Sequence, residues 1–207
     1  PRHIDVFHSL ESTNTFAREQ AANRDYAGSV VFAERQTAGR GRRGKEWLSP
    51  FGASIYMSVL WDFEQGAQAL QGLSLAVGVA VRRALLELGL ADVSLKWPND
   101  ILVAKQKIAG ILIQNKAQGN FITHSVIGLG FNVNQILFKA YSPKATSLRL
   151  QLNKEYEILE IEEQFLSFLY VRLMRLKKGE NQDNEYLKAL FLKDTPAAFE
   201  SDNKQFM

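Results

Sequence analysis

The chain has 207 residues and 46% of them are hydrophobic, so it can bury one full core with at most a small appendage. It contains no cysteine and only three scattered histidines, which excludes a disulfide framework and a cysteine-based zinc site and argues against a histidine-built metal site. The net charge of +3 is mild and much of the basicity lies in one loop, which favours a local anion site over a surface that coats nucleic acid. The sequence has no apolar run of membrane-spanning length and no signal-peptide pattern, so we expect a cytoplasmic protein without a membrane partner.

Hydrophobic periodicity predicts short strands and amphipathic helices along the chain. Strands are expected at residues 4–10, 28–36, 53–60, 93–97, 101–104, 108–113 and 121–134. Helices are expected at residues 11–23, 69–90, 156–178 and 184–193. Ser12 or Thr13 can cap the first helix, and Gly89 and Gly179 end the second and third. A hairpin turn is expected at Lys105-Gln106, residues 135–150 are irregular, and the last ten residues resemble the start of a further unit.

One loop, Thr37–Ser49, combines three glycines, four cations and Trp47 in the sequence TAGRGRRGKEWLS. We call it the basic loop. Glycines let a backbone come close to a ligand, arginines grip phosphate or carboxylate through paired donors, and an indole offers a face to a flat ring. Arg/Gly tracts also occur in disordered RNA-binding tails, but those repeat their motif, whereas this one occurs once between two predicted strands. The basic loop is therefore predicted to bind a ligand.

Three further segments place polar groups or glycines where a ligand could bind. Ser12-Thr13-Asn14 opens a helix whose free N–H groups suit a small polar or anionic group, although a plain N-cap explains the same residues. Lys96-Trp-Pro-Asn-Asp100 ends a strand with a cation, an amide and a carboxylate, although a turn also explains Pro-Asn-Asp. Gly110, Gly128 and Gly130 interrupt apolar strands, which indicates room for a ligand or another backbone.

Taken together and in this order, these segments resemble the biotin–protein ligases (biotin–acetyl-CoA-carboxylase ligases). The motifs GRGRRG, KWPND and KIAGIL carry the resemblance, which extends from about Phe7 to Leu176. It implies an α+β fold of the class II aminoacyl-tRNA synthetase type, with a mixed, largely antiparallel central sheet covered by helices. It also implies a catalytic domain over residues 1–195, followed at residues 196–207 by the beginning of a truncated C-terminal SH3-like β-barrel.

The resemblance implies a two-step reaction with Mg²⁺ as cofactor and biotin and ATP as substrates. Biotin and MgATP would form biotinyl-5′-adenylate and pyrophosphate. A lysine of a biotin carboxyl carrier protein domain would then attack the mixed anhydride and release AMP. Many family members carry an N-terminal helix-turn-helix domain, and here the catalytic part begins almost at residue 1, so no DNA partner is expected. A homodimer is left open.

Matched position by position, the resemblance also implies roles for individual residues. The implied catalytic residues are Lys107 and Arg42, whose charges would help to bring two anionic reactants together. The implied biotin-binding residues are Ser12, Thr13, Asn14, Gln36, Gly39, Arg40, Gly41, Arg42, Lys107, Gly110, Gly128 and Gly130. The implied ATP- and adenylate-binding residues are Arg40, Arg42, Trp47, Lys96, Asn99, Lys107 and Asn132. Asp100 is the implied Mg²⁺ contact, directly or through water.

Two alternatives lead to different experiments. A lipoate–protein ligase shares the implied fold, and binding of lipoate without biotin would favour it. A nucleic-acid-binding module that uses the basic loop would bind with a steep dependence on salt and would not respond to biotin or ATP.

Overall fold

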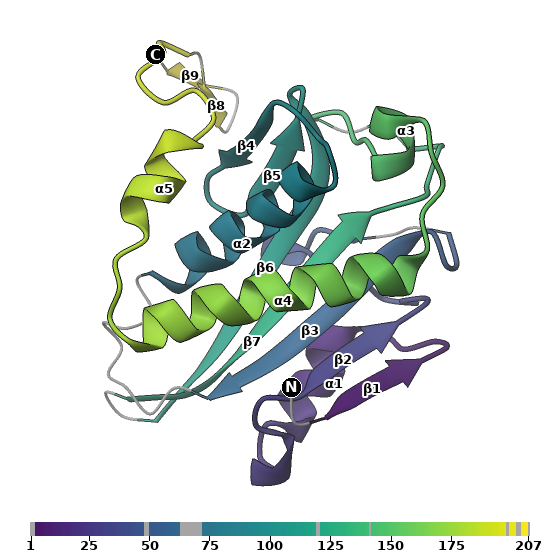
Figure 1. The fold of residues 1–207 in the computed structure, drawn as a ribbon, viewed down its shortest axis with the longest axis vertical. Helices are drawn as coiled ribbons and strands as arrows, with labels where there is room; N and C mark the ends of the chain where they lie inside the picture. The colour runs from purple at the N-terminus through teal and green to yellow at the C-terminus, as the bar shows by residue number, and fades with distance from the viewer. Residues whose placement is uncertain are drawn as a thin grey trace.

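A seven-stranded sheet forms the middle layer of the structure (Figure 1). This computed structural model describes residues 3–47, 50–62, 72–118, 121–140, 142–197, 199–201 and 204–206. The strands of the sheet are β1 (Ile4–Phe7), β2 (Val30–Ala33), β3 (Ser54–Asp62), β4 (Val93–Lys96), β5 (Asp100–Val103), β6 (Gln106–Gln118) and β7 (Phe121–Asn132). Their order is β1-β2-β3-β7-β6-β5-β4; β1 and β2 run parallel and the other neighbours antiparallel. The mixed, largely antiparallel sheet is therefore confirmed.

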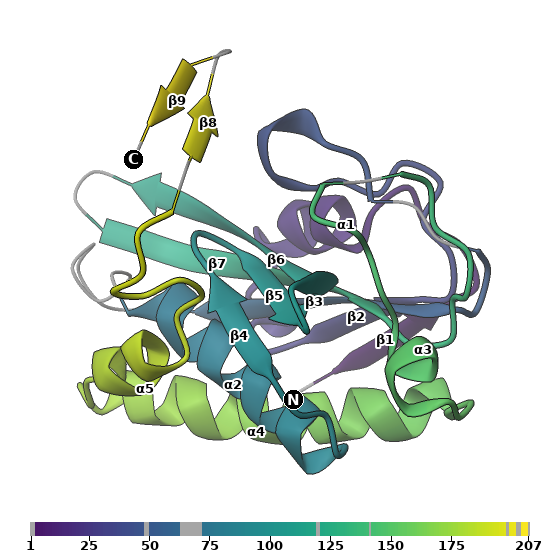
Figure 2. The same ribbon diagram turned by 90° about the horizontal axis from the view of Figure 1, so that it is seen from above.

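Helices cover the two faces of this sheet unequally (Figure 2). They are α1 (Thr13–Gln20), α2 (Leu73–Glu87), α3 (Leu148–Leu152), α4 (Ile158–Lys177) and α5 (Asp183–Lys188). The main hydrophobic core lies between the sheet and the helices α2 and α4, and a smaller cluster lies under α1 on the opposite face. The basic loop lies on the same side of the sheet as α1 (Figure 2). One face of the sheet therefore carries the main core, and the other, less covered face is available for a ligand site.

The helix ends follow the sequence signals. The Ser12 side chain caps α1 by accepting a hydrogen bond from Thr15 N at 3.5 Å, as predicted. α1 ends at Gln20 and is followed by a 3-10 turn, η1 (Arg24–Tyr26), within the stretch predicted as helix. Gly89 and Gly179, with φ angles of +92° and +77°, follow α2 and α4. Glycine tolerates such angles without the steric cost that other residues meet, which explains these termini.

The last predicted helix is shorter than expected, because α5 ends at Lys188 and does not continue to Lys193. The next residues run along the outer edge of β4 instead. Leu95 N donates to Ala189 O at 2.8 Å, and Phe191 N donates to Leu95 O at 2.9 Å. An edge strand presents unpaired N–H and C=O groups, and this segment satisfies part of that edge. Pairing with a distant strand therefore overrode the local helical pattern.

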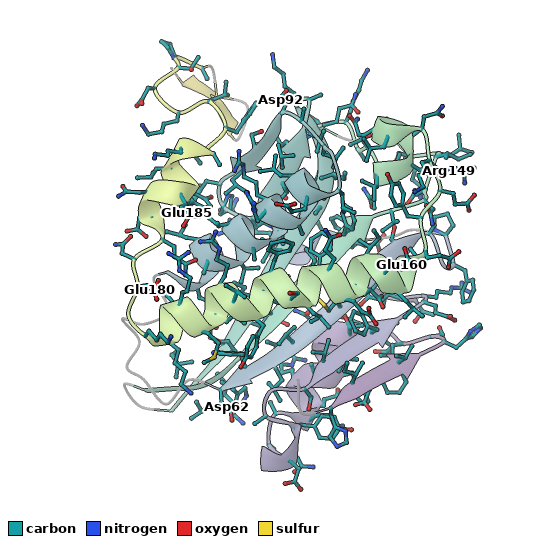
Figure 3. The ribbon with its side chains drawn as sticks, viewed as in Figure 1. Asp62, Asp92, Arg149, Glu160, Glu180 and Glu185 are labelled. Atoms are coloured by element: carbon teal, nitrogen blue, oxygen red, sulfur yellow. The ribbon has the colours of Figure 1, made fainter. Side chains whose placement is uncertain are left out.

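Ion pairs connect α4 to α5 and to the segment just before it, where Glu180 and Glu185 are labelled in Figure 3. Arg172 Nη2 lies 2.6 Å from Glu185 Oε2, and Arg175 Nε lies 2.6 Å from Glu180 Oε2. The hydrogen bond from the Arg172 guanidinium holds the pKa of the Glu185 carboxyl below its usual range. Glu180 lies in the connection between the two helices, whereas Glu185 of α5 also lies 3.4 Å from Arg175 Nη1, so two arginines of α4 contact the same carboxylate of α5.

Several remaining predictions concern turns and the chain end. The β5–β6 turn is at Ala104-Lys105, one residue earlier than predicted, with φ angles of +46° and +65° that are typical of a type I′ hairpin. Residues 48–49 of the predicted loop and 69–71 of the predicted second helix lie outside the described residues, as do residues 119–120, where the sequence Gln118-Gly119-Asn120 predicts a further turn. Near the chain end, β8 (Phe199–Ser201) and β9 (Lys204–Phe206) form an antiparallel pair. Among the described residues, no helix has the length and hydropathy needed to span a membrane.

Candidate functional site

The basic loop, described from Thr37 to Trp47, folds back on itself as a narrow hairpin. Trp47 N donates to Gly39 O at 3.0 Å, and Arg40 and Glu46 form an antiparallel bridge. A Cβ atom at Gly39 would collide with Trp47 O, so a glycine is needed for the two arms to come this close. The loop that the sequence marks by its glycines is therefore a closed hairpin that ends on its tryptophan.

The base of this hairpin is bonded to the connection between β1 and α1. Thr37 N donates to Leu10 O at 2.8 Å, and Ala38 N donates to Glu11 O at 2.9 Å. These bonds hold the basic loop against the N-terminal end of α1. Two segments predicted separately to bind a ligand are thus brought together by backbone hydrogen bonds.

The loop's arginines extend from the hairpin toward solvent. Arg40 and Arg42 are exposed, and Gly41 between them donates its N–H to Lys45 O within the hairpin. Neither arginine takes part in an ion pair with another described residue. Their guanidinium groups therefore have donors available for an anionic ligand.

Trp47 rests on two glycines that are aligned on adjacent strands. Gly110 of β6 and Gly130 of β7 are register partners, and we call this pair the glycine row. A Cβ atom would lie 2.6 Å from Trp47 Cε2 if placed on Gly130 and 2.8 Å from Cζ3 if placed on Gly110. Trp47 Nε1 is buried and has no hydrogen-bond partner among the described residues. The room that these glycines were predicted to make is thus occupied by the indole.

Lys107 lies beside the indole and is paired with Asp100. Its Nζ is 5.2 Å from the centre of the Trp47 ring and 2.7 Å from Asp100 Oδ1. Lys96 is the register partner of Asp100 on β4, which adds a second cation at this end of the sheet. The lysine and aspartate side chains are 26% and 19% exposed, so the pair is partly buried and less screened than a surface ion pair. The implied catalytic lysine and the implied metal contact are therefore direct neighbours.

A polar cluster made of Thr13, Asn14, Gln36 and Ser58 lies at the N-terminus of α1. Thr13 N donates to Gln36 Oε1 at 2.7 Å, and Thr13 Oγ1 lies 3.1 Å from the same oxygen. Ser58 Oγ of β3 lies 2.8 Å from Thr13 Oγ1 and 2.6 Å from Asn14 Oδ1. Ser58 is 0% exposed, and Thr13 and Asn14 are 3% and 5% exposed. The N-terminal residues of α1 therefore do more than cap the helix, because they bond to the sheet and to the start of the basic loop.

The Asn14 side chain lies across the sheet over Gly128. Ser58, Gly128 and Leu112 are register partners on β3, β7 and β6. Asn14 Nδ2 donates to Leu112 O at 3.1 Å and to Gln114 Oε1 at 3.2 Å. A Cβ atom at Gly128 would collide with Asn14 Oδ1. In this structure the missing side chain at Gly128 makes room for Asn14.

The amides of Asn99 and Asn132, both predicted to contact nucleotide, bond to the protein backbone. Asn99 Nδ2 donates to Ile111 O at 3.0 Å, and Ile111 N donates back to Asn99 O at 2.9 Å. Asn132, which is 4% exposed, donates from Nδ2 to Thr146 O at 2.9 Å. Both contacts hold the ends of strands near the site, and they leave each Oδ1 as the group available to a ligand.

Ser58 and Gln114 belong to this site but are not among the residues predicted from the sequence. Ser58 is a polar residue within the apolar run of β3, at a position that is fully buried. Buried hydroxyls need hydrogen-bond partners, so a serine in such a run was the available signal. Gln114 follows an apolar run near the middle of β6 and gave no comparable signal.

The site therefore has two chemically different ends on one face of the sheet. One end offers neutral hydrogen-bonding groups from the polar cluster. The other end holds the Lys107–Asp100 pair, Lys96 as the register partner of Asp100, and the exposed arginines of the basic loop on the hairpin that ends on Trp47. An elongated ligand with a polar neutral head and an anionic tail matches this arrangement.

Comparisons with known proteins agree with this geometry. Residues 6–132, more than half of the chain, match the Biotin/lipoate A/B protein ligase family. The chain is 40% identical over 130 residues to the bifunctional ligase/repressor BirA of Escherichia coli, covering 63% of this chain and 40% of that protein. It is 40% identical over 152 residues to the biotin–[acetyl-CoA-carboxylase] ligase of Mycobacterium tuberculosis, covering 71% of this chain and 55% of that one.

A solved structure extends the agreement to the fold. The biotin protein ligase from Aquifex aeolicus in complex with biotin and ATP superposes with a TM-score of 0.76 at 27% identity, covering 91% of this chain and 78% of that one. The chain thus spans about half or less of the two curated relatives' length and most of this solved structure. By its sequence match and its fold, the chain belongs to the biotin/lipoate A/B protein ligase family.

Proposed function

We propose that this chain is the catalytic part of an ATP-dependent biotin–protein ligase. In the first step it would form biotinyl-5′-adenylate and pyrophosphate from biotin and ATP. In the second it would transfer biotin to a lysine of a biotin carboxyl carrier protein domain and release AMP. The names of the matched relatives and the ligands of the Aquifex aeolicus structure support the biotin and ATP assignments. A cytoplasmic location belongs to the same proposal.

The observation that carries the proposal is that Lys107 Nζ lies 5.2 Å from the ring centre of Trp47, at the end of a basic loop whose base is bonded to the N-terminal end of α1. A biotin whose ureido ring bonds to the polar cluster would extend its carboxylate past the Trp47 indole toward Lys107. Trp47 offers its ring to the adenine or to the ligand chain, and Arg40 and Arg42 can turn inward onto the phosphates. This assigns a role to each end of the site without requiring a covalent enzyme group.

The chemistry requires two anions to react, and the charges of the site suit that requirement. A carboxylate oxygen of biotin would attack the α-phosphorus of ATP, and the bond from that phosphorus to the bridging oxygen would break as pyrophosphate leaves. The ammonium of Lys107 and the guanidinium of Arg42 would reduce the repulsion and stabilise charge on the equatorial oxygens. In the second step a neutral lysine amine of the acceptor attacks the acyl carbon, AMP leaves, and the amine proton is released.

Magnesium is part of this proposal as the counterion of ATP. Mg²⁺ is commonly held by one or two carboxylates together with phosphate oxygens and water. Asp100 is a single carboxylate beside the site, and no group of three or more metal-ligating side chains gathers among the described residues. This donor set fits an ion that arrives with the nucleotide, with Asp100 contacting it directly or through water. The bound ion would neutralise phosphate charge.

Calorimetry with biotin, lipoate and MgATP tests the proposal directly. We expect biotin to bind, lipoate to bind at least about 10-fold more weakly, and biotin with MgATP to raise the melting temperature more than either ligand does singly. Pyrophosphate release that depends on biotin would establish the first step, and biotin transfer to a carrier domain the second. Binding of lipoate without biotin, or strong salt-sensitive nucleic-acid binding that neither ligand changes, would contradict the proposal.

A further inference from the structure

A cavity of about 380 Å³ lies at the outer edge of β4, and we call it the edge cavity. Its lining comes from α2, the start of β4, the β5–β6 turn and residues 188–192 at and after the end of α5. Arg82 and Leu86 of α2 line it, so it lies on the side of the sheet that α2 covers, opposite the basic loop (Figure 2). Val93, in the lining, is three residues from Lys96, or about 10 Å along the strand. The edge cavity is therefore separate from the candidate functional site.

Three cations from different parts of the chain border the edge cavity. They are Arg82 of α2, Lys105 of the β5–β6 turn and Lys188 at the end of α5. None of them forms an ion pair with another residue that the structure describes. Asp92, labelled in Figure 3 just before β4, is the one carboxylate among the described lining residues. Three cations and one carboxylate leave the lining with a net charge of +2.

Arg82 is the cation whose position the fold fixes. Its Nε donates to Val93 O at 2.9 Å, which ties α2 to the first residue of β4. Within the described part of the chain, its Nη groups make no hydrogen bond, so a planar fork of donors is available to an oxyanion. The side chain is partly buried, and burial, followed by the charge of Arg83, lowers the pKa of the Arg82 guanidinium. A partly buried cation without a carboxylate partner is stabilised by an anion that binds beside it.

We propose that the edge cavity is a binding site for a small multivalent oxyanion, either a di- or tricarboxylate or a phosphate ester. One anionic group accepts hydrogen bonds from Arg82, and a second faces Lys105 and Lys188. Both lysines are exposed, and a single exposed charge pair contributes little, so the ligand needs more than one anionic group to engage Arg82 as well. The volume of the cavity is within the range of small-molecule sites. The inference does not depend on the proposed function.

Thermal denaturation with two probes, citrate and inorganic phosphate, tests whether the wild-type chain binds such an anion. We expect at least one probe to raise the Tm by about 5 °C or more at 100 times its Kd. The tighter probe identifies the ligand as a carboxylate or a phosphate. NaCl at the same ionic strength should have a smaller effect, because it screens charges without bridging them. Equal shifts with NaCl, or no shift with either probe, would overturn the proposal.

Substitutions in the lining show whether the anion binds in the edge cavity. Calorimetry should give a Kd for the tighter probe that is about 10-fold higher or more in Arg82→Gln and in a chain carrying both Lys105→Gln and Lys188→Gln. Arg83→Gln is the matched control, because Arg83 is the next residue on α2, is exposed and is paired with Glu87; its Kd should change by less than about 2-fold. If Arg82→Gln lacks a cooperative thermal transition, the substitutions of the exposed lysines decide.

A further variant, Arg42→Gln, distinguishes the edge cavity from the basic loop, which also attracts anions. The Kd for the tighter probe should stay within about 2-fold of the wild-type value in this variant, because the loop lies on the opposite side of the sheet. Binding that is lost in Arg42→Gln and retained in the lysine double variant would overturn the proposal. The proposed function would be unaffected by that result, because biotin binding tests it separately.

Discussion

Glu162, a buried carboxyl in the middle of the fold, leads to a quantitative prediction about pH and stability. It lies on the face of α4 that packs on the sheet and is 6% exposed. Burial, and to a lesser extent the nearby carboxylate of Glu34, raises the pKa of Glu162 to about 7 from 4.5. Both effects disfavour the ionised form, because water no longer solvates the charge and a like charge is close. Glu162→Gln removes the titration while keeping the shape of the side chain.

The sign and size of the effect follow from the two pKa values. Below pH 4.5 the side chain is protonated in the folded and unfolded chain, so the wild type has its full stability. As the pH rises toward 7, the unfolded chain releases the proton and the folded chain retains it, so the free energy of unfolding falls. The interval of about 2.5 pH units corresponds to a loss of about 3 kcal/mol, which is complete slightly above pH 7. For a chain of this size that loss lowers the Tm by roughly 6–10 °C.

Urea unfolding of the wild type and Glu162→Gln between pH 4.5 and 8 measures this directly. The two should have similar stability near pH 4.5, and the variant should be more stable by about 3 kcal/mol at pH 8. Glu163→Gln is the control, because this neighbouring glutamate on the same helix is exposed. If Glu162→Gln and the wild type change in parallel across the range, Glu162 does not retain its proton in the folded state and the reasoning is wrong.

The remaining predictions concern the site itself. Gly130→Ala places a Cβ atom 2.6 Å from the Trp47 indole, so adenylate formation should fall about 10-fold or more. Gly78→Ala in α2 is the control and should keep activity, because its Cβ atom would lie 3.4 Å from Tyr186 Cε2; equal rates for the two variants would contradict a role for the indole's position. Lys107→Ala should slow biotin-dependent pyrophosphate release by about 100-fold or more, and a near-normal rate would assign the catalytic charge elsewhere. Arg42→Gly should release activated biotin from the site, so bystander proteins become labelled on their lysines; labelling no greater than with the wild type would rule out retention by this arginine.

Much of the site could be predicted from short segments because each carries its own chemical signal. The basic loop holds its glycines and cations within a few residues, and the Ser12 cap and the glycine helix ends are local features that the structure confirms. The resemblance based on three motifs then identified the family that the comparisons show. These local signals could not show which side chains on other strands contact each of these residues.

Register explains the features that sequence reasoning missed or placed differently. Ser58, Gly128 and Leu112 come from three strands far apart in the chain, and only their alignment lets Asn14 bond across all three. A distant partner also explains why α5 ends at Lys188, because the residues that follow it form hydrogen bonds with the edge of β4.

By itself the sequence determined most of the helices and strands, the residues whose side chains suit ligand binding, and the family. It could do so because periodicity, helix caps and motifs depend on residues close together in the chain. Only the tertiary structure decided that Trp47 occupies the glycine row, that Lys107 pairs with Asp100, and that the buried Ser58 contacts both Thr13 and Asn14 at the neutral end. The physical reason is that these relations depend on which atoms of distant strands are placed within about 3 Å of each other, and packing of the whole sheet sets that distance.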